Sequence, residues 1–82
     1  MASKLFATAA LKKYRESKGY TQQEMVGLLA IEMDIDLSFS TYQKWEQGTL
    51  PLTPDNALMI SRFTKIDVRE LLQRKEPVSE QG

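Results

Sequence analysis

Residues 38–48 carry more structural information than any other part of this 82-residue chain. They read Ser38-Phe-Ser-Thr-Tyr-Gln-Lys-Trp-Glu-Gln-Gly48. Serine is a favoured N-cap and glycine a favoured C-terminal stop, so the stretch predicts a helix over residues 39–47. With about 3.6 residues per turn, Tyr42 and Trp45 lie together on one side of that helix. The polar residues of the other side are Ser40, Gln43, Lys44 and Gln47.

The polar side of this helix has the chemistry that reads DNA bases. Gln43 can bond adenine through both ends of its amide, Lys44 can donate to guanine, and Ser40 can serve either base. A helix of about ten residues also fits the major groove of DNA. An ordinary amphipathic helix with a solvated polar face shows the same pattern, so this helix alone does not separate the two interpretations.

Four more short helices are expected, each opened by a capping residue or by a proline at its first position. They fall within residues 4–18, 22–32, 54–63 and 68–74. The first of them starts after either Ser3 or Thr8, since both side chains can cap a helix. Residues 76–82 are expected to form a disordered tail. The sequence therefore predicts one all-α domain of five helices over residues 1–75.

The segment before Ser38 has a different pattern. Ile31, Met33, Ile35 and Leu37 alternate with polar residues, and this period of two is typical of a strand. A single strand in a helical domain has nothing to pair with. The segment is therefore either an extended linker held by its apolar side chains, which we favour, or a continuation of the second helix.

The composition excludes several classes of function. The chain has 11 basic and 11 acidic residues, no cysteine and no histidine. Disulfides, thiolate or imidazole metal sites and a histidine general base are therefore excluded. No apolar run approaches the roughly 20 residues of a membrane span, and no signal-peptide core is present. We expect a cytoplasmic protein that is not an enzyme and needs no cofactor, metal or membrane.

The overall pattern resembles the Xre/Cro family of lambda-repressor-like helix-turn-helix proteins. The similar segments are Leu11–Met25, Ser38–Gly48 and Ile66–Leu72, so the resemblance spans most of the chain. It implies a compact five-helix lambda-repressor-like domain, in which the helices at 22–32 and 39–47 form the helix-turn-helix. It also implies sequence-specific binding of double-stranded DNA by a prokaryotic or phage repressor, with helix 39–47 in the major groove.

The resemblance also implies roles for individual residues. Those expected to read bases are Phe39, Ser40, Gln43 and Lys44. Thr21 and Gln22 are expected to lie over the phosphate backbone, with Gln22 donating to a phosphate. Arg15 and Glu46 match a pair that ties the first helix to the end of the third, and arginine can hold a carboxylate through two hydrogen bonds.

Two features depart from the family pattern. The turn between the second and third helices is longer, and residues 31–36 are the surplus, with three carboxylates among them. The loop after the third helix, residues 49–53, contains no lysine or arginine. Thr49, Thr53 and the first N–H groups of the fourth helix are the phosphate-contacting groups expected there.

The zero net charge limits how many phosphates one copy of the chain can neutralise. We therefore expect weak binding per monomer and a homodimer on a two-fold site, because the second copy adds a second set of contacts. The same features suit an alternative function, a protein-interaction module on the same fold, such as an antitoxin-like or regulator-inhibiting partner. The contact strip expected for that alternative is Ile31, Met33 and Ile35.

Overall fold

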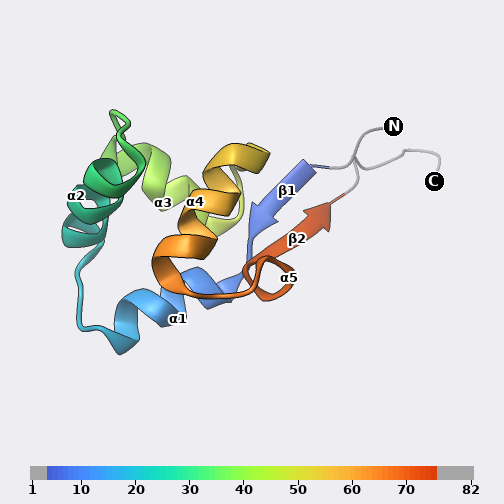
Figure 1. The fold of residues 1–82 in the computed structure, drawn as a ribbon, viewed down its shortest axis with the longest axis horizontal. Coiled ribbons are helices and arrows are strands. Elements are labelled where there is room, and N and C mark those ends of the chain that lie inside the picture. Colours follow the sequence, from blue (N-terminus) through green and yellow to red (C-terminus); the bar gives the residue numbers. More distant parts are fainter. Residues whose placement is uncertain (1–3, 76–82) are drawn as a thin grey trace.

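The computed structural model describes residues 4–75, and in this range the chain forms five helices and two short strands (Figure 1). Their order is β1 (Lys4–Ala7), α1 (Ala9–Ser17), α2 (Gln22–Met33), α3 (Phe39–Gln47), α4 (Pro54–Thr64), α5 (Val68–Leu71) and β2 (Leu72–Lys75). The five-helix lambda-repressor-like arrangement predicted from the sequence is confirmed. The tail expected at residues 76–82 lies outside the described residues.

Each helix begins where a side chain accepts a hydrogen bond from the backbone of the first turn. These capping residues are Thr8, Thr21, Ser38, Thr53 and Asp67. Of the two starts considered for the first helix, the one at Thr8 is correct, because Thr8 Oγ1 accepts from Ala10 N at 3.2 Å. Helix α3 has the predicted bounds, and Gly48 ends it in the left-handed conformation with φ of 75°.

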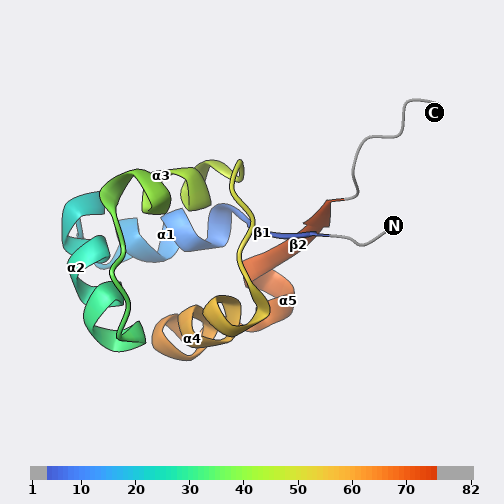
Figure 2. The same cartoon turned by 90° about the horizontal axis from the view of Figure 1, so that it is seen from above.

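The two strands are absent from the all-α prediction. They pair antiparallel, with Leu5 opposite Arg74, and form a ribbon that projects from the helices (Figures 1 and 2). Helix α5 therefore ends at Leu71 rather than near Arg74, because residues 72–75 pair with β1 instead. On the other side of β1, Leu52 N donates to Leu5 O at 2.7 Å. The pairing of β1 with β2 joins segments from opposite ends of the described chain, so no local sequence pattern indicates it.

Residues 31–37 combine the two structures considered for them, a continuation of the second helix and a linker held by its apolar side chains, whereas the exposed strip expected at Ile31, Met33 and Ile35 is not formed. Helix α2 continues to Met33, and Asp34 then turns the chain in the left-handed conformation with φ of 54°. Met33 is buried at the end of α2, and after the turn Leu37 is buried and Ile35 packs against the core, whereas Ile31 remains 78% exposed. The alternation therefore reflects a helix end followed by a loop, and the strip of Ile31, Met33 and Ile35 is not a continuous surface.

One hydrophobic core joins the helices and the ribbon. Its buried members are Ala7, Leu11, Met25, Leu29, Met33, Leu37, Tyr42, Trp45, Leu52, Ala57, Ile60 and Leu71. They come from every helix, so each helix has one buried side and one side left for solvent or a ligand. Figure 2 shows α3 running along the outside of the domain beside α1.

Candidate nucleic-acid interface

Helix α3 presents its polar side outward because its aromatic side is buried. The Tyr42 side chain is 0% exposed and Trp45 is 3% exposed, and their rings meet edge to face with centroids 6.5 Å apart. The rotation of the helix about its own axis is therefore set by two large buried rings. On the outward side of α3, the exposed residues are Phe39, Ser40, Lys44 and Gln47, and Gln43 lies partly buried among them.

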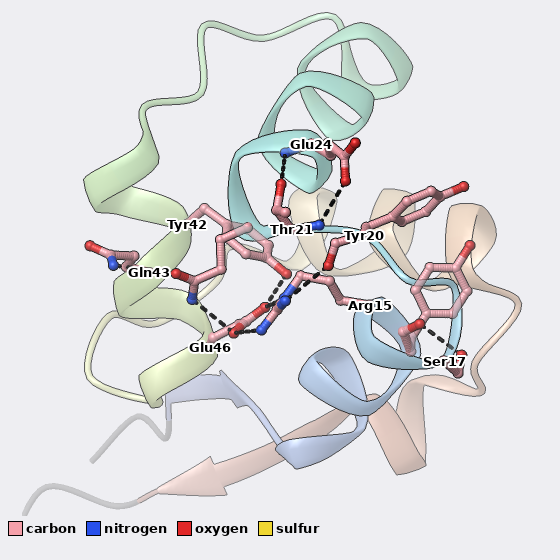
Figure 3. A network of polar contacts seen from close by, with 10 residues as sticks. Arg15, Ser17, Tyr20, Thr21, Glu24, Tyr42, Gln43 and Glu46 are labelled. Atoms are coloured by element: carbon pink, nitrogen blue, oxygen red, sulfur yellow. Dashed lines mark hydrogen bonds and ion pairs between the residues drawn. The ribbon is translucent and has the colours of Figure 1, made fainter.

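An ion pair anchors the end of α3 to α1. Arg15 Nε donates to Glu46 Oε2 at 2.7 Å and Arg15 Nη2 donates to Glu46 Oε1 at 3.3 Å (Figure 3). The Arg15 and Glu46 side chains are only 12% and 4% exposed. A third donor of the same guanidinium, Nη1, reaches the carbonyl of Tyr20 at 3.0 Å, just before α2. One arginine therefore connects α1, the start of α2 and the end of α3.

The Glu46 carboxylate is fully supplied with hydrogen-bond donors. Besides Arg15, the Tyr42 hydroxyl donates to its Oε2 and Gln22 Nε2 donates to its Oε1 at 3.1 Å. Burial alone raises the pKa of this carboxyl, but the hydrogen bonds from Arg15, Tyr42 and Gln22 outweigh burial, so the pKa lies below its ordinary value of 4.5. Glu46 is therefore ionised at neutral pH and acts only as an acceptor.

Gln22 and Gln43 lie in contact across the helix-turn-helix. Gln43 Nε2 donates to Gln22 Oε1 at 3.4 Å, while the Gln22 amide nitrogen is directed to Glu46. Three residues predicted for separate roles are thus brought together in one network: the phosphate contact Gln22, the base reader Gln43 and the ion-pair member Glu46. An amide nitrogen carries two hydrogens, so Gln22 keeps one for a phosphate.

The start of α2 is closed by a capping box, as predicted. Thr21 Oγ1 accepts from Glu24 N at 3.1 Å, and Glu24 Oε1 accepts from Thr21 N at 2.8 Å (Figure 3). The Thr21 backbone N–H is therefore already used, and its hydroxyl hydrogen is the group that can still meet a phosphate. The Glu24 side chain is exposed beside it and brings a negative charge to this helix start.

The two threonines expected to contact phosphate after α3 differ in what they have left to donate. The Thr49 hydroxyl donates to the carbonyl of Lys44 at 3.4 Å. The Thr53 hydroxyl accepts from Asn56 N at 3.2 Å as the N-cap of α4, which leaves its hydrogen for another acceptor. Both side chains are exposed, but Thr53 is the better placed donor, at a helix start that favours anions.

The sequence model of the helix-turn-helix family matches residues 11–71, most of the chain. The chain belongs to the Xre/Cro, or lambda-repressor-like, helix-turn-helix family. Members of this family are typically DNA-binding regulators and not enzymes, and this domain is a helix-turn-helix DNA-binding regulator in that general sense. A search of curated proteins and a search of solved structures each found no match.

In this Xre/Cro domain, the lengthened segment between α2 and α3 is divided between helix and loop. Residues 31–33 belong to α2, and the connection to α3 runs from Asp34 to Ser38. The side chains of Glu32, Asp34 and Asp36 are all exposed.

Within residues 4–75, no helix is long and apolar enough to cross a membrane.

Sequence reasoning missed the polar role of Tyr42. We expected only an aromatic anchor, but its hydroxyl also holds Glu46 from inside the core. The pKa of Tyr42 is raised above its ordinary value of 10.0, mainly by burial and secondly by this hydrogen bond. The available signal was the spacing of four residues between Tyr42 and Glu46, which places two side chains on the same face of a helix.

Proposed function

We propose that this protein is a sequence-specific repressor of a prokaryote or phage, which acts in the cytoplasm on double-stranded DNA. The observation that carries the proposal is the orientation of α3, whose buried Tyr42 and Trp45 turn an uncharged polar face and one lysine outward. Amide, hydroxyl and ammonium groups at the surface of a short helix are the groups that read base edges in the major groove.

In the proposed complex, α3 enters the major groove. Gln43 bonds adenine, Lys44 donates to guanine, Ser40 serves either base and Phe39, which is 38% exposed, contacts a thymine methyl group. The residues proposed to contact phosphates are Thr21, Gln22, Thr49 and Thr53. Phosphate contacts fix the register of the protein on the duplex, whereas the α3 side chains supply the sequence preference.

We propose that the protein binds as a homodimer. Eleven basic residues are balanced by eleven acidic residues, so a single copy neutralises few phosphates and gains little affinity from counterion release. A two-fold dimer on a palindromic site doubles the contacts and places two α3 helices about one turn of DNA apart. Light scattering of the purified protein, with and without a duplex, tests this state directly.

Selection from a random duplex library at low salt, followed by gel shift, tests the function. We expect an enriched motif with two-fold symmetry and binding that weakens as salt is added. Binding without any enriched motif, or no binding, would favour the interaction-module alternative. The contact strip expected for that alternative is not formed, because Met33 lies in the core and Ile35 packs against it. Of the three residues of the strip, Ile31 is the exposed one.

A further inference from the structure

A chain of hydrogen bonds leads from the core of the domain to the outward face of α3. It begins at the Glu46 carboxylate, which Arg15 and the Tyr42 hydroxyl hold from two sides. Gln22 Nε2 donates to this carboxylate at 3.1 Å, and Gln43 Nε2 donates to Gln22 Oε1 at 3.4 Å. The last member of the chain is the residue proposed to read adenine.

The direction of every hydrogen bond in this chain follows from its first member. An ionised carboxylate can only accept, whereas an amide can present either its NH₂ or its C=O end. Because Glu46 accepts, Gln22 turns its NH₂ toward Glu46 and its C=O toward Gln43. Gln43 must then turn its own NH₂ inward, which leaves it one N–H and its carbonyl oxygen for an outside partner.

Those two remaining groups match one base in particular. In the major groove, adenine offers an acceptor at N7 and a donor at N6, so it pairs with one N–H and one carbonyl oxygen of an amide. Guanine offers two acceptors and cannot use the carbonyl oxygen of Gln43. A Gln43 amide held in one orientation therefore discriminates between the two purines better than an amide that rotates freely.

We infer that Glu46 is a positioning residue for base recognition, because its carboxylate sets the donor–acceptor order of Gln22 and, through it, of Gln43. This inference rests on the proposed function and adds a role in specificity to the ion pair with Arg15. The hydrogen bond from Tyr42 supports it, since a carboxylate held from inside the core cannot turn away from Gln22.

A matched pair of variants separates positioning from stability. Glu46→Gln and Arg15→Lys both weaken the ion pair, so both lower the folded fraction and the total affinity. Only Glu46→Gln introduces a side chain that can donate to Gln22 Oε1, and so only this variant allows the chain of hydrogen bonds to reverse. Arg15→Lys leaves the acceptor in place.

The measurement is a ratio of two dissociation constants. Each protein is titrated with two duplexes that differ only at the base pair for which Gln43→Ala abolishes the preference. A change in the folded fraction alters both dissociation constants equally and cancels in their ratio. We expect Glu46→Gln to reduce the ratio by about threefold or more, as for a weakened bidentate contact, and Arg15→Lys to keep it. Equal ratios in the two variants would overturn the inference.

A second measurement needs no DNA. The rates at which the Gln43 side-chain amide hydrogens exchange with solvent, followed by nuclear magnetic resonance, report whether its NH₂ end is held inward in the free protein. We expect faster exchange in Glu46→Gln, where the chain of hydrogen bonds can reverse and turn this NH₂ end outward, and the wild-type rate in Arg15→Lys. An unchanged rate in Glu46→Gln would refute the positioning role. A wild type without base preference would defeat the proposed function instead, and the amide measurement would still decide the role of Glu46.

Discussion

The side chains of Gln22 and Gln43 bridge the two helices of the helix-turn-helix, with Gln43 Nε2 donating to Gln22 Oε1 at 3.4 Å. A residue expected to bind phosphate thus touches a residue expected to read a base. Because Gln22 also donates to Glu46, the bridge continues into the buried ion pair with Arg15. The residues proposed for base reading and for phosphate binding are therefore joined to the buried ion pair by one polar network.

Replacing Gln43 by alanine should relax base preference at a single position of the operator. The loss should be about 1–3 kcal/mol of discrimination, because a bidentate amide contact to adenine is removed. Selection profiles of the two proteins from the same random library measure it. An unchanged profile would show that another face of α3, or another element, reads the DNA.

Replacing Gln22 by alanine should have two effects. The sequence alone predicts a uniform loss of affinity for all duplexes, because a phosphate contact carries no base information. Since Gln22 also accepts from Gln43, we expect in addition a smaller preference at the position that Gln43 reads. Binding curves for duplexes that vary at this position and at one control position separate the two effects. A loss of affinity that is equal for all duplexes would argue against a contribution of Gln22 to base preference.

Replacing Arg15 by alanine should destabilise the domain strongly. The Glu46 side chain is only 4% exposed, so the substitution leaves a buried carboxylate without its cation, at a cost of about 3–5 kcal/mol. Urea unfolding followed by circular dichroism gives the change in free energy. Arg69→Ala is the matched control, because the Arg69–Asp67 pair is largely exposed and its loss should barely change the unfolding midpoint.

Acid should remove the stability that Glu46 supplies. Its pKa is lowered in the folded protein, so the contribution is complete above the ordinary value of 4.5 and is lost as the pH falls through the lower folded value. The difference in unfolding free energy between wild type and Glu46→Gln should therefore be constant near neutral pH and shrink below about pH 4.5. A difference that stays constant into strong acid would contradict this account.

Alkali should remove the stability that the neutral Tyr42 hydroxyl contributes to the folded protein. Burial and the hydrogen bond to Glu46 raise the pKa of this hydroxyl above 10.0, so stability is present below that pH and lost as the unfolded chain ionises above it. Tyr42→Phe should cost about 1.5–3 kcal/mol at neutral pH through the lost hydrogen bond to a charged group. It should also flatten the decline above pH 10.0, which denaturant titrations at several pH values can follow.

Local sequence patterns were enough to predict that five helices form and which side of α3 is exposed, but not where α5 ends. Ser38 and Gly48 delimit that helix by capping chemistry, and the three-residue spacing of Tyr42 and Trp45 marks its buried side. The Arg15–Glu46 pair was reached through the family resemblance, because nothing local connects residues so far apart in the chain.

Only the tertiary structure decided how the distant segments meet. The β1–β2 ribbon joins residues 4–7 to residues 72–75, and a pairing between such remote segments leaves no periodic signal in either one. Asp34 adopts the left-handed conformation at the end of α2, so the segment with a strand-like pattern is a helix end followed by a loop in which Leu37 is buried and Asp34 and Asp36 are exposed. The contact of Gln22 with Gln43 likewise depends on how α2 packs against α3, since hydrogen-bond partners are set by distances in space and not by spacing along the chain.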